Sequence, residues 1–296
     1  MTQTIALIGA GAMGGAIGAR LARTGTRLRV FDRNPAQMQP LEALGATATT
    51  SAAEAARGAQ AVILSLNAPG IVRDAVFGSD GVASGAAPGT LIIDMSSIDP
   101  TATQALARDA ADRGLRWVDS PLSGGAPKAA TGQLTLMQGG AEADVSEAQG
   151  LLAQVASNQT RMGDAGAGQA TKLINQVLCG LNFLAVAEAT ALAEAAGISA
   201  ERIPEALAGG RADSAILQEY MPRFAGRDYR PTGRIDNMVK DLNGAQDLAR
   251  LSHTPMPLTA LCAEIHRQLT ARGLGDQDQA ALMEFFPNPL AKEASR

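Results

Sequence analysis

The chain has 296 residues, of which 46% are hydrophobic and 18% charged, and its formal net charge is −4. This length is enough for two ordinary domains with buried cores, and the apolar content argues against a disordered chain. The charge is acidic, and the aromatic residues number only 6 Phe, 2 Tyr and 1 Trp. We therefore expect no nucleic-acid partner, because both a basic surface and stacking platforms are lacking.

Cysteine and histidine are too scarce to build a disulfide framework or a metal centre. The sequence holds two cysteines, Cys179 and Cys262, and two histidines, His253 and His266. A zinc site needs more thiolate or imidazole ligands than these residues supply. No charged segment followed by an apolar run opens the sequence, so we predict no signal peptide. We expect a cytoplasmic protein without a metal site.

Short apolar runs alternate with helix-forming segments in the first half of the sequence. Strands are predicted at residues 4–8, 27–31, 60–66, 90–93, 116–118 and 133–137, and a helix at 12–23. Strands separated by helices predict a parallel, doubly wound sheet. The character changes near Gly163, and from Gly168 onward only helices are predicted. We therefore expect an α/β domain at residues 1–163 and an all-helical domain at 164–296.

The first helix of the second half is unusually long. It is predicted over residues 168–196 and would extend about 40 Å at 1.5 Å per residue. Asn182, Glu188 and Glu194 interrupt its apolar run. We interpret it as a buried or interfacial helix and expect no membrane contact. A helix of this length exceeds the private core of a small domain, which suggests a homodimer or homotetramer.

The first chemical motif is glycine-rich and follows the first predicted strand. Its residues are Gly9, Ala10, Gly11, Ala12, Met13 and Gly14, which match the G-x-G-x-x-G pattern between a strand and a helix. Gly9 permits a tight turn, Gly11 lets the backbone approach a pyrophosphate, and Gly14 allows close helix packing. The helix N-terminus then offers N–H groups to the phosphates. This context predicts a dinucleotide-binding, Rossmann-like domain.

An acidic residue ends the second predicted strand. Asp32 lies 23 positions after Gly9, where a carboxylate can accept hydrogen bonds from the adenosine ribose and repel a 2′-phosphate. The neighbouring Arg33 could instead pair with the 2′-phosphate of NADP, or lie solvated in a loop. The pattern favours NAD as the cofactor and leaves NADP as the alternative.

A lysine is the best remaining candidate for the catalytic group. Neither tyrosine is followed by lysine at the fourth position, and both histidines are interpreted as surface residues. Lys172 and Asn175 share one face of the long helix, and Cys179 and Asn182 continue that face. A polar cluster on an otherwise apolar helix suggests a pocket, although a solvated stripe would have the same spacing.

The sequence resembles the β-hydroxyacid dehydrogenases over essentially its whole length. The matching stretches are residues 8–14, 32–35, 93–100, 119–127, 166–176 and 234–242, in the family's order. The resemblance implies a fold like that of 6-phosphogluconate dehydrogenase, with a Rossmann-like domain followed by an all-α domain. One departure is Asn67-Ala68, where the family usually has Leu-Pro after the fourth strand.

The resemblance also implies an activity. It predicts an NAD(P)-dependent oxidoreductase that interconverts a small hydroxy acid and its semialdehyde or keto form. Tartronate semialdehyde (2-hydroxy-3-oxopropionate) is the favoured substrate. Oxidation of 3-hydroxyisobutyrate or of an aldonate such as threonate is the alternative, and imine reduction is a more distant one.

Roles at individual positions follow from the same resemblance. Lys172 would be the general acid/base and Asn175 would orient the substrate or Lys172. A small carboxylate would be bound by Ser123, Gly124 and Gly125, whose consecutive glycines let backbone donors approach an anion.

The cofactor-side positions are implied in the same way. Ser96 and Ser97 would lie near the nicotinamide ribose, and Lys240 would close over the nicotinamide end of the cleft. Asn34 and Asn67 would also bind the cofactor, together with Asp32 and Arg33.

Overall fold

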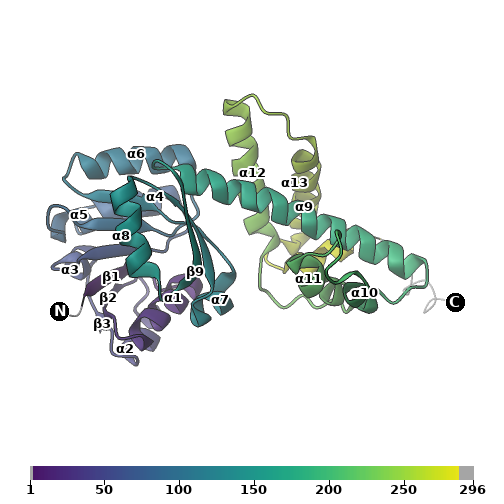
Figure 1. Ribbon diagram of the computed structural model, residues 1–296, viewed down its shortest axis with the longest axis horizontal. Helices are drawn as coiled ribbons and strands as arrows, with labels where there is room; N and C mark the ends of the chain where they lie inside the picture. The colour runs from purple at the N-terminus through teal and green to yellow at the C-terminus, as the bar shows by residue number, and fades with distance from the viewer. Residues whose placement is uncertain (1–2, 287–296) are drawn as a thin grey trace. The chain divides into compact units, whose positions relative to one another are not determined.

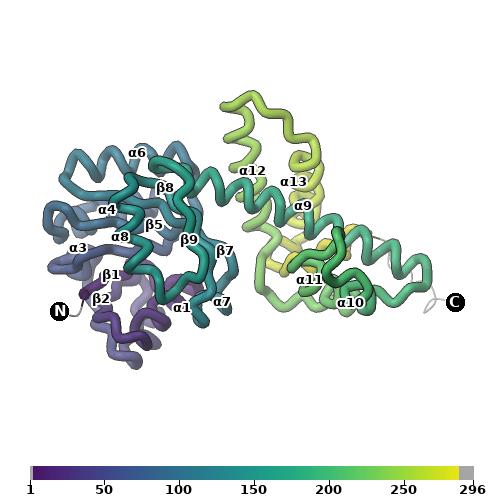
Figure 2. The backbone as a smooth tube through the Cα atoms, in the orientation of Figure 1, coloured from purple at the N-terminus to yellow at the C-terminus, as the bar shows by residue number. Residues whose placement is uncertain are grey.

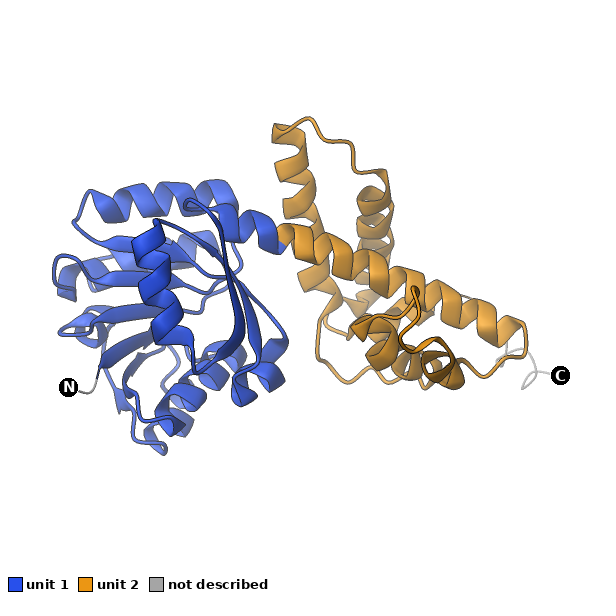
Figure 3. Ribbon diagram, viewed as in Figure 1, with its two compact units in different colours: residues 1–172 blue, residues 173–296 orange. Residues whose placement is uncertain are grey.

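The computed structural model of the chain describes residues 3–286. The chain forms two compact units, Met1–Lys172 and Leu173–Arg296 (Figure 3). The sequence places the domain division after residue 163, whereas the two units divide after Lys172, inside a helix that continues through both.

The first unit is built on one nine-stranded sheet in the order β3-β2-β1-β4-β5-β6-β8-β7, with β9 paired to β8 (Figure 1). The strands are β1 (Thr4–Ile8), β2 (Arg27–Phe31), β3 (Thr47–Ala48), β4 (Ala61–Leu64), β5 (Leu91–Asp94), β6 (Arg116–Asp119), β7 (Leu122–Ser123), β8 (Leu134–Gly139) and β9 (Ala156–Gly163). Strands β1 to β6 are parallel, as the alternation of strands and helices predicts.

The expectation of a wholly parallel sheet is wrong at the edge formed by β7, β8 and β9. β8 runs antiparallel to β6 and to β7, and β9 then runs parallel to β8. Figure 2 labels β7, β8 and β9 in this part of the first unit. The short connection from β7 through a single helix to β8 reverses the chain direction. The sheet is therefore mixed.

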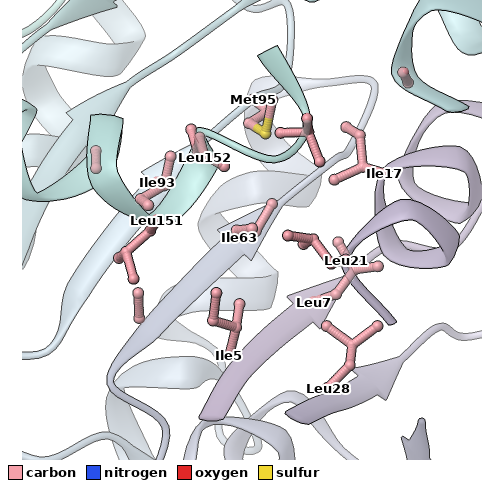
Figure 4. Packing of buried hydrophobic residues seen from close by; sticks show 14 of the residues in the cluster. Ile5, Leu7, Ile17, Leu21, Leu28, Ile63, Ile93, Met95, Leu151 and Leu152 are labelled. Carbon is pink, nitrogen blue, oxygen red and sulfur yellow. The ribbon is translucent and has the colours of Figure 1, made fainter. Parts of the chain in front are cut away.

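Alternating side chains of each strand pack on opposite faces of the sheet. Ile5 and Leu7 of β1 belong to a core with Ile17 and Leu21 of α1 and Leu151 of α8 (Figure 4). The intervening β1 residues belong to a second core, formed with α3, α4 and α6. The helices are α1 (Ala12–Arg23), α2 (Gln39–Glu42), α3 (Ala52–Ala56), α4 (Pro69–Phe77), α5 (Val82–Gly85), α6 (Pro100–Ala111), α7 (Gly125–Thr131) and α8 (Glu142–Leu152). This two-sided packing explains the continuous apolar runs of the central strands.

The second unit is helical throughout its described part, where the only strand-like feature is an isolated bridge between Arg234 and Asp278. Its helices are α9 (Ala167–Ala195, which begins in the first unit), α10 (Ile203–Leu207), α11 (Ala215–Ala225), α12 (Ile235–Leu251) and α13 (Pro257–Leu269). Phe183 of α9, Phe224 of α11 and Leu242 of α12 meet in one apolar core.

α9 is the one helix among the described residues that is long and apolar enough to cross a membrane by length and composition. The core helix of a soluble protein passes the same test. Val186 and Ala187 of α9 lie in the core of the second unit, whereas Ile174, Leu178 and Leu192 are exposed. The helix therefore has one buried side and one exposed apolar side.

The interpretation of His266 as a surface residue is wrong. Its side chain is fully buried, with Nδ1 2.8 Å from the Cys262 carbonyl oxygen and Nε2 2.9 Å from the Gln279 side-chain oxygen. Cys262 lies one turn before His266 in α13, and Gln279 belongs to the buried segment that follows, so the polar neighbours in sequence did not indicate exposure. Burial lowers the pKa of His266.

Candidate active site

The glycine-rich turn lies where the strand order reverses, between β1 and β4. Gly9 has a φ of 93°, and a Cβ there would stand 2.4 Å from the Ser65 carbonyl oxygen. A Cβ at Gly14 would stand 2.0 Å from the Gly9 oxygen, whereas one at Gly11 would meet nothing within 4 Å. Gly9 and Gly14 are therefore required for packing, and the open space at Gly11 suits a bound pyrophosphate.

A pocket of about 740 Å³ opens beside this turn, entirely within the first unit. The predicted cofactor residues that line it are Gly9, Gly11, Ala12, Met13, Asp32, Arg33 and Asn67. Ligands bind outside the carboxyl ends of the strands at such a switch point, so this pocket fits a dinucleotide.

Asp32 fixes the shape of the turn in addition to facing the pocket. Its carboxylate accepts the Ala10 N–H at 2.7 Å and the Asn34 N–H at 2.8 Å. Arg33 is exposed. Asn34 accepts the Ala36 N–H at 3.2 Å and so caps a short 3₁₀ turn. This contact gives Asn34 a local structural task.

Ser96 and Ser97, which follow β5, differ in burial. Ser96 is buried, and its hydroxyl oxygen accepts the Leu66 N–H at 3.0 Å, which ties the loop after β4 to the loop after β5. Its own N–H donates to the Asp94 carboxylate at 3.0 Å. Ser97 is half-buried. Ser96 therefore shapes the loop from within.

The N-terminal turn of α9 is held by a buried carboxylate at the end of β6. Asp119 accepts the Gly166 N–H at 2.8 Å and the Gln169 N–H at 2.9 Å. A Cβ at Gly168 would stand 2.5 Å from the Met137 oxygen, so only glycine permits this approach. Burial raises the pKa of Asp119 to about 6.

The Gln169 side chain extends this attachment to β5. Its carboxamide oxygen accepts the Ile98 N–H at 3.2 Å, and its NH₂ group donates to the Ser96 carbonyl oxygen at 2.8 Å. Lys172 is half-buried one turn further along α9. Because β1, β4, β5 and β6 are parallel, this turn and the glycine-rich turn lie at the same edge of the sheet.

The predicted anion loop is built on two glycines with positive φ. Gly124 has a φ of 121° and Gly125 a φ of 69°, between β7 and α7. Ser123 precedes them, four residues after Asp119. Positive φ at both positions favours glycine, and two residues without side chains let a carboxylate approach the backbone N–H groups.

Two further candidates, Asn175 and Lys240, lie in the second unit and share a hydrogen-bonded chain. Asn175 donates to the Gln176 side-chain oxygen at 2.9 Å, and Gln176 donates to the Asp241 carboxylate at 2.6 Å. The Lys240 ammonium lies 3.4 Å from the other Asp241 oxygen. This chain links α9 to α12 in that unit. Asn175 also lies 3.6 Å from the Cys179 sulfur, as a shared helix face predicts.

Four residues that hold predicted site residues within their own units were assigned no role from sequence. They are Asp119 and Gln169 in the first unit and Gln176 and Asp241 in the second. All lie inside stretches that carry the family resemblance. Their polar character in apolar surroundings was a visible signal. Their partners were not visible, because the contacts join distant segments.

Comparison with known proteins agrees with this geometry. A sequence model of the NAD binding domain of 6-phosphogluconate dehydrogenase matches residues 4–163, and one of the NAD-binding region of NADP-dependent 3-hydroxyisobutyrate dehydrogenase matches residues 166–286. L-threonate dehydrogenase of Cupriavidus necator is 34% identical over 97% of both chains. The 2-hydroxy-3-oxopropionate reductase of Escherichia coli is 34% identical over 95% of this chain and 96% of its own.

A solved structure is similar as well. The 3-hydroxyisobutyrate dehydrogenase of Mycobacterium tuberculosis, determined with L-serine, has a TM-score of 0.87 and 32% identity, covering 96% of this chain and 99% of that one. The fold, the pocket and these matches define an NAD(P)-dependent oxidoreductase. The chain belongs to the β-hydroxyacid dehydrogenase family.

Proposed function

We propose that the enzyme reduces a small aldehyde that carries a carboxylate, with Lys172 as the general acid, and catalyses the reverse oxidation with Lys172 as the base. The observation that supports this most is the buried attachment of the first turn of α9. Asp119 and Gln169 fix that turn at the carboxyl ends of β5 and β6, and Lys172 follows directly. Because this turn is fixed, the Lys172 side chain starts from a defined backbone position, as proton transfer to a bound substrate requires.

The chain's own residues have separable tasks in this reaction. A bound reduced nicotinamide supplies the hydride for the carbonyl carbon. The Lys172 ammonium donates a proton to the carbonyl oxygen as negative charge develops there. The backbone N–H groups of Gly124 and Gly125, with the Ser123 hydroxyl, hold the substrate carboxylate. Asn175 orients the substrate or Lys172.

We propose 2-hydroxy-3-oxopropionate as the substrate. Support comes from the similarity to the E. coli reductase of that compound, but the threonate dehydrogenase of C. necator is equally similar. The alternative is therefore oxidation of threonate or 3-hydroxyisobutyrate. A panel of these acids and semialdehydes, assayed with both cofactors, ranks them by kcat/KM. If kcat/KM is higher for either hydroxy acid than for the semialdehyde, that hydroxy acid is the better substrate and the proposal of 2-hydroxy-3-oxopropionate is wrong.

Replacing Lys172 tests the central claim. We expect Lys172→Ala to lower kcat at least ~100-fold, because general acid/base catalysis contributes at least that factor. The affinity for NADH, measured by fluorescence titration, should stay near that of the wild type, since the glycine-rich turn is untouched. Near-normal turnover in this variant would remove Lys172 from the chemistry.

We propose NAD(H) as the preferred cofactor. The Asp32 carboxylate lines the pocket and would repel a 2′-phosphate, whereas Arg33 is exposed beside it. We expect a higher kcat/KM for NADH than for NADPH, and we expect Arg33→Ala to leave the NADH value unchanged. A preference for NADPH that disappears in Arg33→Ala would show that the arginine decides the specificity.

A further inference from the structure

We propose that Gln169 is a positioning residue, whose buried carboxamide sets the place of Lys172 relative to the Ser96–Ser97 loop. This inference rests on the proposed role of Lys172. The Gln169 side chain is 1% exposed, so it makes its contacts without competition from water. It touches two backbone groups of the loop after β5, the Ile98 N–H and the Ser96 carbonyl.

Both contacts are directional, and together they require an amide. The oxygen of the carboxamide accepts at one point of the loop while its nitrogen donates at another, two residues away. A carboxylate can only accept, and a hydrocarbon side chain can do neither. Loss of either contact leaves a buried backbone group without its partner, which native structures avoid.

The loop that Gln169 holds is itself fixed on its other sides. The Ser96 hydroxyl accepts the Leu66 N–H, and the Ser96 N–H donates to Asp94. The loop therefore cannot shift alone. Gln169 joins α9 to a rigid group of strand ends rather than to a mobile segment.

The helix end of this connection is equally constrained. Asp119 accepts the backbone N–H of the same Gln169, and Gly168 approaches Met137 too closely for any side chain. Gln169 and Lys172 are three residues apart in α9 and so lie on one helix face. A displacement of Gln169 would therefore be transmitted to Lys172 within a single turn.

The expected consequence is a larger effect on rate than on cofactor binding. Misplacing a catalytic group by about 1 Å can lower a rate ~100-fold. The pocket beside the glycine-rich turn is lined mainly by the loops after β1, β2 and β4 and by α3 and α4, and it contains no residue of α9. Disturbing Gln169 should therefore lower kcat by a larger factor than it raises the dissociation constant of NADH.

The first test is Gln169→Met, which keeps the length of the side chain and removes both hydrogen bonds. We expect kcat to fall about 10- to 100-fold, measured with the substrate that the wild type turns over fastest. The dissociation constant of NADH should change by a much smaller factor than kcat. A wild-type kcat in a folded Gln169→Met protein would overturn the proposal.

The second test, Gln169→Glu, separates positioning from a loss of stability. A neutral carboxylic acid offers one O–H donor and one carbonyl acceptor and can reproduce both contacts, whereas the carboxylate cannot donate to Ser96. Ionisable groups of the same contact network are Asp119, which accepts the Gln169 N–H, and Asp94, which accepts the Ser96 N–H, and Lys172 follows three residues later on α9. The two aspartates disfavour ionisation of the introduced carboxyl and the lysine favours it.

We therefore expect the activity of Gln169→Glu, relative to the wild type at each pH, to be highest at low pH and to decline as the introduced carboxyl ionises. Gln159→Glu is the matched control, because Gln159 of β9 donates one amide hydrogen bond to the Gln149 carbonyl at 3.0 Å. Its relative activity should not vary with pH. A pH-independent ratio for Gln169→Glu would overturn the proposal.

The two hypotheses fail in different ways. If Lys172→Ala is active, the proposed function fails, whatever the Gln169 variants do. If Lys172→Ala is inactive while Gln169→Met turns over normally, only the positioning role fails.

Discussion

At the residue scale, the two neighbouring aspartates at the carboxyl ends of β5 and β6 differ in the hydrogen bonds that their carboxylates accept. Asp94 and Asp119 are register partners across the two strands, and both are fully buried. Asp119 accepts a backbone N–H with each oxygen. Asp94 accepts the Ser96 N–H with one oxygen, while its buried Oδ2 accepts no hydrogen bond from the described residues. Both oxygens of Asp119 therefore cap the first turn of α9. When Asp94 is ionised, one of its oxygens has no hydrogen-bond donor among the described residues.

This contrast predicts a stabilising substitution. Burial raises the pKa of Asp94 to about 6, above its usual value of 3.8. The folded state then holds the proton more tightly than the unfolded state, so Asp94 lowers stability progressively as pH rises from about 4 to about 6, and constantly above that. We expect Asp94→Asn to raise the free energy of unfolding above pH 6, on the order of 3 kcal/mol at most, and to have little effect near pH 4.

The measurement is the denaturation midpoint as a function of pH. Asp119→Asn is the matched control, because an amide NH₂ group would face one of the two N–H groups that the carboxylate now accepts. Because burial also raises the pKa of Asp119 to about 6, removal of its charge brings a similar gain above pH 6. The lost hydrogen bond offsets that gain by about 1–3 kcal/mol, so Asp119→Asn should be stabilised less than Asp94→Asn. An Asp94→Asn protein that is less stable than the wild type at high pH would contradict the assignment.

At the scale of elements, strands with apolar side chains were predictable and polar strands were not. β1 and β2 begin and end at the predicted residues. β1 is a nearly continuous apolar run, and β2 alternates arginine with buried Leu28 and Val30. β9 was missed, because six of its eight side chains are polar or glycine and most are exposed. Backbone pairing with β8 holds it. The two-residue strands β3 and β7 are too short to leave a periodic signal.

In the long helix α9, the bounds were predictable from sequence, but the contacts with distant segments were not. Its predicted range, 168–196, differs by one residue at each end from α9, because alanine and leucine favour helix locally. The sequence also grouped Asn175 with Cys179 on one face, and the structure places them in contact. Asn182, assigned to that same stripe, lies 3.4 Å from the Ser214 hydroxyl. Its partner comes from a segment more than thirty positions away.

At the scale of the whole molecule, we propose that the chain assembles into a homodimer or homotetramer through the exposed apolar side of α9. Ile174 is 58% exposed, Leu178 65% and Leu192 71%. Large apolar side chains gathered on one helix side commonly mark an association surface. We expect light scattering of the purified protein to give a mass two or four times that of the chain.

The double variant Leu178→Glu/Leu192→Glu should shift that mass toward the monomer, because paired carboxylates cannot be buried in an apolar interface. Leu251→Glu is the control, since Leu251 is also 71% exposed but ends α12. A monomeric wild type would exclude assembly through α9.

The sequence by itself determined the Rossmann-like first unit, the helical second unit and the dinucleotide turn at residues 9–14. Periodicity, glycine geometry and helix propensity act over a few neighbouring residues and can be read directly. Only the tertiary structure decided that His266 is buried, that Ser96 supports a loop and that Asp119 and Gln169 hold the first turn of α9. The contacts of Asp119 and Gln169 join residues 47 to 73 positions apart, and Ser96 and His266 contact Leu66 and Gln279, 30 and 13 positions away. The packing of separate segments, not any local preference, brings these residues together.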